Sequence, residues 1–180
     1  ALYFRGLAHM VRGNPESATI DIEASYDLGL RGNEVRANRA YARFLFGVTE
    51  EGNQFSAVSE NEPLNALYYA YNGDYQLSVE RYFQALDLLE IANVLESDLG
   101  IAHMLRGKVF MALGLEETAK DVFADSSGLE LPTAQHYADR GINHAYFNQY
   151  ESAFSDLGKA IEINPGKASY YDNRAKIFAN

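Results

Sequence analysis

Apolar residues recur every three or four positions along most of the chain, in stretches separated by short polar or glycine-containing links. This period indicates amphipathic helices, because the apolar residues of a half-buried strand would alternate instead. Residues 133–166 give the clearest case, in which two predicted helices flank a tight turn and Pro165 closes the second. Residues Asn33 to Phe46 predict another helix. The run Asn14-Pro15-Glu16 predicts a helix start, because Asn caps helices, Pro suits the first helical position and an acid favours the first turn.

A small residue marks the first helix of each predicted pair. Its occurrences are Gly6, Ala40, Ala66, Gly107, Gly141 and Ala175. Three of the five spacings between them are 34 residues, and the remaining two are 26 and 41. We expect the two helices of a pair to pack closest at this marker residue. A larger side chain there would overpack the pair, at a cost of about 1–3 kcal/mol.

Residues 133–166 resemble a tetratricopeptide repeat. The family pattern W-x2-L-G-x2-Y, A-x3-F, P is matched by Tyr137-x2-Arg140-Gly141-x2-His144, by Ala153-x3-Leu157 and by Pro165. The resemblance covers nearly the whole chain and implies an all-α superhelix, or solenoid, of about five helix pairs plus a terminal helix. We expect one domain over residues 1–180, and we expect the chain to continue beyond them. Its repeats are 1–30, 31–61, 62–98, 99–132 and 133–166, with a half repeat at 167–180.

Two of these repeats are irregular. Repeat 31–61 is degenerate, and its part from Gly47 to Asn61 predicts a loop with a short helix near Gln54–Ser59. In repeat 62–98 we take Ala66 as the marker and Gly73-Asp74-Tyr75 as the turn, because such residues favour turns. That assignment predicts an unusually long second helix, which continues to Leu95 and absorbs seven extra residues.

Composition narrows the function classes. Apolar residues make up 47% of the chain, which is typical of a folded protein, and no apolar run approaches the length of a membrane helix. The net charge of −10 disfavours nucleic acid and anionic membrane surfaces as partners. The chain has no cysteine, which excludes disulfides and cysteine-ligated zinc but leaves the compartment open. We expect a soluble chain and favour the cytoplasm over the periplasm.

An arginine precedes the marker five times, at Arg5, Arg39, Arg106, Arg140 and Arg174. A ladder for an acidic peptide or a phosphate is one interpretation. The other is an ion pair within a repeat, because Asp21 and Asp156 lie fifteen residues past the markers Gly6 and Gly141. We favour the ion pairs Arg5–Asp21 and Arg140–Asp156, since a residue that recurs in a repeat protein usually serves packing.

No pattern predicts catalysis, a cofactor or a metal. His9 and His144 lie four repeats apart, and His136 and His144 lie two helical turns apart without a third ligand. Zinc requires three or four converging ligands. The sequence also lacks the nucleophile, metalloprotease and phosphate-loop motifs. We therefore predict a protein that is not an enzyme.

The resemblance implies that first helices line a concave protein-binding groove. Carried over residue by residue, the contact positions are Tyr3, Leu7, Met10, Tyr41, Phe44, Leu67, Tyr71, Met104, Lys108, Met111, Ile142 and Tyr146. The subtype that grips the acidic C-terminus of heat-shock chaperones is disfavoured, because these positions are mostly apolar. We predict an adaptor that binds a peptide or helix of a partner protein. The alternatives are a self-associating module, with a homo-oligomer as product, and the regulatory or substrate-binding part of a larger enzyme.

Overall fold

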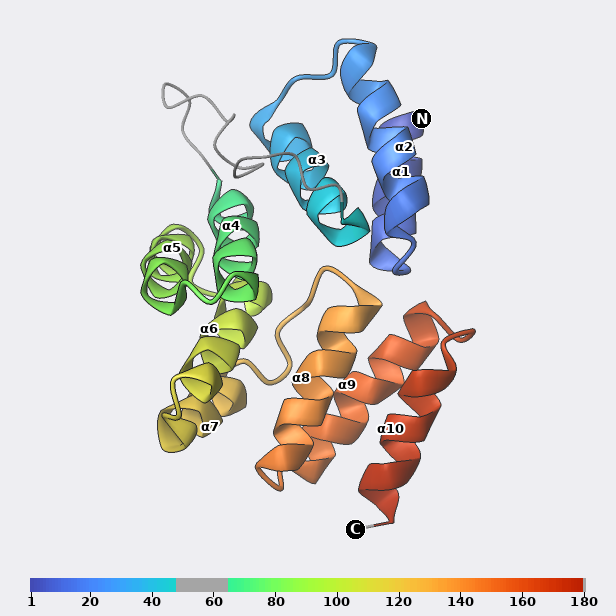
Figure 1. The fold of residues 1–180 in the computed structure, drawn as a ribbon. Helices are drawn as coiled ribbons and strands as arrows, with labels where there is room; N and C mark the ends of the chain where they lie inside the picture. Colours follow the sequence, from blue (N-terminus) through green and yellow to red (C-terminus); the bar gives the residue numbers. More distant parts are fainter. Residues whose placement is uncertain (48–64, 180) are drawn as a thin grey trace. The chain divides into compact units, whose positions relative to one another are not determined.

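The computed structural model describes residues 1–47 and 65–179, and every regular element in these ranges is an α-helix (Figure 1). The predicted all-α class is therefore confirmed. The loop and short helix predicted near Gln54–Ser59 lie outside the described residues. Contacts along the chain divide it into two compact units, Ala1–Ser97 and Asp98–Asn180. A single domain over residues 1–180 stays a prediction.

Unit one holds five helices within its described residues. They are α1 (Leu2–Val11), α2 (Pro15–Asp27), α3 (Asn33–Phe46), α4 (Ala66–Ser78) and α5 (Tyr82–Leu95). Helix α1 packs on α2, and α4 packs on α5, while α3 contacts both α2 and α4. The predicted helix from Asn33 to Phe46 is confirmed. Helix α2 begins at Pro15 with Asn14 in the capping position, although the Asn14 side chain makes no capping hydrogen bond.

Unit two also holds five helices in the part of the chain that the structure describes. They are α6 (Gly100–Ala112), α7 (Glu116–Asp125), α8 (Ala134–Tyr146), α9 (Tyr150–Ile163) and α10 (Ala168–Phe178). Helix α6 pairs with α7, and α8 pairs with α9. The Thr133 side chain caps α8 by accepting a hydrogen bond from the His136 amide. Helix α10 packs on α9 and α8 and buries Tyr170, so it covers one side of the α8–α9 pair.

The two helices of a pair approach most closely at the marker glycines. A Cβ atom on Gly6 would lie 2.7 Å from Ile22 Cγ1, and one on Gly107 would lie 2.7 Å from Phe123 Cζ. A Cβ atom on Gly141 would lie 3.1 Å from the Ala153 carbonyl oxygen. These distances confirm that the marker is small because the helices leave no room for a side chain.

The marker assigned to the third repeat is wrong. A Cβ atom on Gly73 would lie 2.8 Å from Leu89 Cγ in the paired helix, whereas Ala66 is the first residue of α4. Helix α4 continues through Gly73-Asp74-Tyr75 to Ser78, so the predicted turn is wrong as well. Helix α5 has 14 residues, the same as α9, and is not unusually long. Burial of Tyr71 and Gly73 against the neighbouring helices overrides the turn preference of the local sequence.

The corrected marker can be tested by substitution. We expect Gly73→Ala to lower the free energy of unfolding by about 1–3 kcal/mol, because the new methyl group overlaps Leu89. In a Leu89→Ala background the same change is expected to cost nothing, since the methyl group enters the vacated space. Urea unfolding of the four proteins measures both effects.

Gly158→Ala in α9 is the matched control. No atom lies within 4 Å of the position of its Cβ, so the substitution is expected to stabilise the helix by about 0.5–1 kcal/mol. An equal cost of Gly73→Ala with and without Leu89 would contradict the assignment.

Candidate protein-binding surfaces

A buried ion pair joins α8 to α9. Arg140 Nε lies 2.7 Å from Asp156 Oδ2, and Arg140 Nη2 lies 2.7 Å from Asp156 Oδ1. The third nitrogen, Nη1, donates to the Ser126 carbonyl oxygen at 2.5 Å. His144 Nε2 lies 3.7 Å from Asp156 Oδ2. The predicted pair Arg140–Asp156 is confirmed, and the Arg140 side chain is only 1% exposed.

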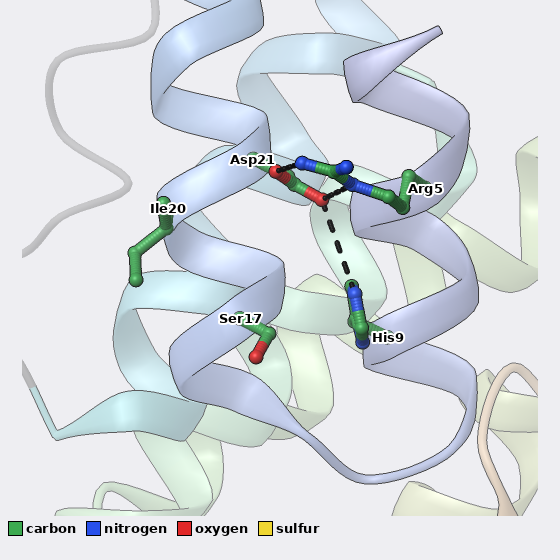
Figure 2. A pocket seen from close by; sticks show the side chains of 5 residues that line it. All are labelled: Arg5, His9, Ser17, Ile20 and Asp21. Carbon is green, nitrogen blue, oxygen red and sulfur yellow. Dashed lines mark hydrogen bonds and ion pairs between the residues drawn. The ribbon is translucent and has the colours of Figure 1, made fainter.

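The same arrangement recurs between α1 and α2. Arg5 Nε and Nη2 each lie 2.6 Å from an oxygen of Asp21, and His9 Nε2 lies 4.0 Å from Asp21 Oδ2 (Figure 2). The predicted pair Arg5–Asp21 is confirmed. The hydrogen bonds from Arg5 hold the pKa of the Asp21 carboxyl below its ordinary value. Here, however, the Arg5 side chain is 64% exposed.

A pocket opens beside this exposed pair. Its volume is about 260 Å³, and its lining residues are Arg5, His9, Ser17, Ile20 and Asp21. Figure 2 shows Arg5 and His9 on one helix, both turned toward Asp21 on the other. Sequence reasoning found the ion pair but missed the pocket, since exposure of an arginine depends on which helix packs beside it.

The recurring arginines do not all bind within their own repeat. Arg39 donates from Nε to Glu23 Oε2 at 2.8 Å, and Arg43 donates to the other Glu23 oxygen at 2.9 Å. Glu23 belongs to the preceding helix α2, so this contact joins two repeats. Arg174 lies over the Tyr171 ring, with its guanidinium carbon 5.7 Å from the ring centroid. In the described residues these contacts favour packing over a ladder for acidic ligands.

Five of the twelve residues predicted to line the groove are buried. They are Tyr3, Met10, Tyr41, Tyr71 and Met104. The rings of Tyr41 and Tyr71 stack with centroids 3.7 Å apart, and Tyr41 Oη donates to Asp74 Oδ2 at 2.9 Å. Tyr3 Oη donates to Glu34 Oε1 at 3.2 Å, and burial raises the pKa of Tyr3 to about 12. These side chains fill the space between adjacent helices and offer a partner no surface.

The other predicted positions reach the surface. Five are partly exposed, namely Leu7, Phe44, Leu67, Lys108 and Met111. Ile142 and Tyr146 are exposed, at 42% and 56%. Binding by any of them stays a prediction, and the prediction for Leu67 depends on the marker Ala66, which the structure corrects.

The surface positions of unit two come together across α6 and α8. Lys108 Nζ lies 3.5 Å from Asp139 Oδ2. Tyr146 Oη donates to Glu116 Oε1 at 3.0 Å, a bond that raises the pKa of the Tyr146 phenol. The first contact joins α6 to α8, and the second joins the start of α7 to α8. We name the set Lys108, Met111, Asp139, Ile142 and Tyr146 the first-helix surface.

Sequence reasoning missed Asp139 and Glu116. Neither occupies one of the ligand-contacting positions of the resembled family, so neither was singled out. They could be found by searching for a donor and an acceptor about one repeat length apart in the sequence. Asp139 follows Lys108 by 31 residues, and Tyr146 follows Glu116 by 30. Each offset is close to one repeat length and joins residues of adjacent helix pairs.

Two histidines are buried in α8. Burial lowers the pKa of His136 to about 3, and the charge of Lys108 acts in the same direction. Burial also lowers the pKa of His144. The Nδ1 atom of His136 lies 2.9 Å from Thr133 Oγ1, and that of His144 lies 2.6 Å from Gln149 Oε1. Both imidazoles therefore serve as neutral packing groups.

Across residues 1–47 and 65–179, no three side chains of the types His, Cys, Asp and Glu converge in a way that would hold a metal ion. The same ranges contain no helix with the length and apolar character needed to cross a membrane. The candidate sites described above are the first-helix surface and the pocket beside Arg5.

No protein-family model matches the chain, and no curated protein matches it. Among solved structures the fold is similar to that of TTC0263, a thermophilic TPR protein of Thermus thermophilus. The TM-score is 0.75 at 16% identity, over 99% of this chain and 98% of that chain. A structure of MamA from MSR-1 gives a TM-score of 0.52 at 20% identity, over 90% of this chain and 94% of that one. These likenesses show the fold, and they confirm the resemblance to tetratricopeptide proteins at that level.

The buried histidines predict a pH dependence of stability. His136 has a pKa of about 3 when folded and 6.5 as its ordinary value, so the unfolded chain takes up the proton first as the pH falls. Its contribution to stability is complete above pH 6.5 and is lost between pH 6.5 and 3. Between pH 7 and pH 5 we expect a loss of about 2 kcal/mol from this residue.

The measurement compares urea unfolding of wild type and His136→Gln at pH 7, 6 and 5. The wild type is expected to lose about 2 kcal/mol more than the variant over this range, because glutamine does not titrate. Parallel pH profiles of the two proteins would show that His136 does not carry the effect.

The ion pairs Arg140–Asp156 and Arg5–Asp21 are expected to contribute unequally to the free energy of unfolding, because only the first is buried. Arg140→Leu leaves Asp156 buried without its partner and is expected to destabilise the chain by about 3–5 kcal/mol. Arg5→Leu removes the same bond from an exposed arginine and is expected to cost a small fraction of that. Urea unfolding of both variants checks the difference, and similar costs would contradict it.

Proposed function

We propose that the chain is a non-catalytic scaffold that binds a peptide or helix of a partner protein on the first-helix surface of unit two. The observation that carries this proposal is the exposure of Ile142 and Tyr146 one turn apart on α8, while Lys108 of α6 contacts Asp139 of α8. A single exposed apolar side chain is ordinary on a folded protein. Ile142 and Tyr146, together with the partly exposed Met111 of α6, supply anchors for a partner.

The chemistry of this surface favours an amphipathic segment. Met is adaptable because its side chain is flexible and polarizable, and Tyr combines apolar area with a hydrogen-bonding group. The pair Lys108–Asp139 flanks these anchors and provides polar contacts at the edge. An amphipathic helix places anchors at i, i+3, i+4 and i+7, which suits binding along a helical groove.

The polar groups of unit two support a binding role over catalysis. Asp156 is held by Arg140, and His144 is held by Gln149. The lowered pKa of each buried histidine keeps its imidazole neutral. Each imidazole also contacts a neighbouring side chain, Thr133 for His136 and Gln149 for His144. The net charge of −10 adds to this by disfavouring nucleic acid as the partner.

Two glutamates in place of the anchors test the proposal. In the double variant Ile142→Glu, Tyr146→Glu we expect a partner captured by wild type from a lysate of the source to bind at least about tenfold more weakly, because two charges would enter an apolar contact. Quantitative capture followed by titration of the purified partner measures this.

The matched control is Tyr150→Glu, Ser155→Glu, which adds the same charge to exposed positions of α9. Circular dichroism checks the helicity of each variant. A partner held equally by wild type and both double variants would move binding away from the first-helix surface. Light scattering across a range of concentrations reports self-association separately.

A further inference from the structure

Helix α5 carries apolar side chains on the side that faces away from its own helix pair. Its buried residue Leu89 lies against Gly73 of α4. Phe83 and Val94 lie on the opposite side of α5 and are 72% and 76% exposed, and Ile91 beside them is 42% exposed. Phe83 and Val94 are eleven residues apart, so about three helical turns bring them onto one side. Three exposed apolar side chains on one side of a helix form a patch, which a single one would not.

The marker glycines place the second helices of four pairs in one register. A Cβ atom on the marker would approach the residue sixteen positions later in every case, namely Ile22, Leu89, Phe123 and Leu157. Positions counted from the marker are therefore equivalent in α2, α5, α7 and α9.

The equivalents of the exposed apolar residues of α5 are mostly charged. At the position of Phe83 the other three helices carry Glu16, Glu117 and Glu151. At that of Val94, α2 and α9 carry Asp27 and Glu162, and α7 ends before this position. At that of Ile91 the residues are Ala24, Asp125 and Lys159. Of the second helices that the structure describes, α5 alone is apolar at all three positions.

These positions face solvent in the other pairs as well. The three glutamates equivalent to Phe83 are exposed, and so are Asp27 and Glu162. In α9 they stay exposed although α10 packs on that helix, and in α2 they stay exposed although α3 packs on it. Exposure is thus a property of the position in the repeat, and an adjacent helix does not remove it.

Carboxylates lie within the apolar patch of α5. Asp87 and Glu90 follow Phe83 by four and seven residues, which places them on the same side of the helix, between Phe83 and Val94. Both are exposed. The sequence of α5 contains no lysine or arginine, and its flanks add the exposed acids Glu80, Glu96 and Asp98 against Arg81. We name the set Phe83, Asp87, Glu90, Ile91 and Val94 the α5 face.

We propose that the α5 face binds a basic amphipathic helix of a partner protein. Apolar side chains of that helix pack on Phe83 at one end of the face and on Ile91 and Val94 at the other. Lysine or arginine side chains in its middle pair with Asp87 and Glu90. This site lies on other residues than the first-helix surface and goes beyond the function proposed for that surface.

Charge favours this ligand over a second copy of the chain. Two α5 faces in antiparallel contact would place Phe83 against Val94 of the other copy, and Asp87 against Glu90. Four carboxylates would meet at the centre of that contact, and like charges that face each other across an interface oppose association. A helix with cations at this level replaces the repulsion by attraction. The same carboxylates oppose contact with an anionic lipid surface.

The probe is a pair of designed alanine-based helical peptides. The first has leucines spaced as Phe83, Ile91 and Val94 are, and lysines at the positions of Asp87 and Glu90. The second has the reversed sequence, so the two cover parallel and antiparallel docking. A staple on the far side holds each helix, because a short isolated helix is marginal in water. Fluorescence anisotropy during titration with the chain is expected to show saturable binding of at least one peptide, weakened by added salt.

Variants of the α5 face test its two components. Phe83→Glu, Val94→Glu introduces the residues that α9 carries at these positions, so the helix is retained, as circular dichroism checks. Binding is expected to weaken about tenfold or more, because charges replace both apolar anchors. Asp87→Asn, Glu90→Gln is expected to abolish the preference for the lysine peptide over one with glutamates in place of its lysines.

The matched control is Ile142→Glu, Tyr146→Glu, which adds the same charge to the first-helix surface and is expected to leave binding unchanged. Loss of binding in this control but not in Phe83→Glu, Val94→Glu would place the peptide on the first-helix surface and overturn the proposal. The absence of saturable binding would also overturn it. Equal binding of a peptide with alanines in place of the leucines would do the same, since the contact would then be purely electrostatic.

Light scattering over a range of concentrations at pH 7 tests a second copy as the occupant. We expect wild type and Phe83→Glu, Val94→Glu to have the same mass. A dimer of the wild type that this variant loses would assign the α5 face to self-association and overturn the proposed ligand.

Discussion

The close approach of paired helices at one glycine determines the rest of this structure. At Gly6, Gly107 and Gly141 the backbone of the first helix lies so near the second that a methyl group would not fit without displacement. That short distance lets an arginine one residue before the glycine reach an aspartate on the second helix in two parallel bonds. Packing and polar contacts thus share one register. A shift of one residue in either helix would break both the steric fit and the ion pair.

The equivalent ion pairs of the two units differ in burial. In unit two the pair is buried, and burial of charge is costly unless the remaining donors are satisfied. The Ser126 carbonyl meets that need by accepting from the third nitrogen of Arg140. In unit one the Arg5 side chain is 64% exposed, so solvent can reach the guanidinium. The neighbouring helix end, and not the residues of the pair, therefore decides whether the cluster is core or surface.

The sequence predicted well what depends on one helix pair. The helix from Asn33 to Phe46, the small marker at Gly141 and the pair Arg140–Asp156 all follow from spacing within a repeat. It predicted poorly what depends on neighbouring pairs. Both Ala66 and Gly73 are small, and turn-forming residues around Gly73 favoured the wrong one. Tyr41 and Tyr71 lie on the expected helices, yet their stacking between α3 and α4 makes them core. An aromatic residue suits either place, so only the packing of adjacent helices separates the two.

A repeat architecture covers or exposes the same cluster according to which helix lies beside it. The contact of α7 with Arg140, His144 and Ser152 shows the cluster closed. The pocket at Arg5 shows its counterpart open. Each helix pair presents a surface that its neighbour covers, so the residues of one repeat predict the ion pair but not its exposure.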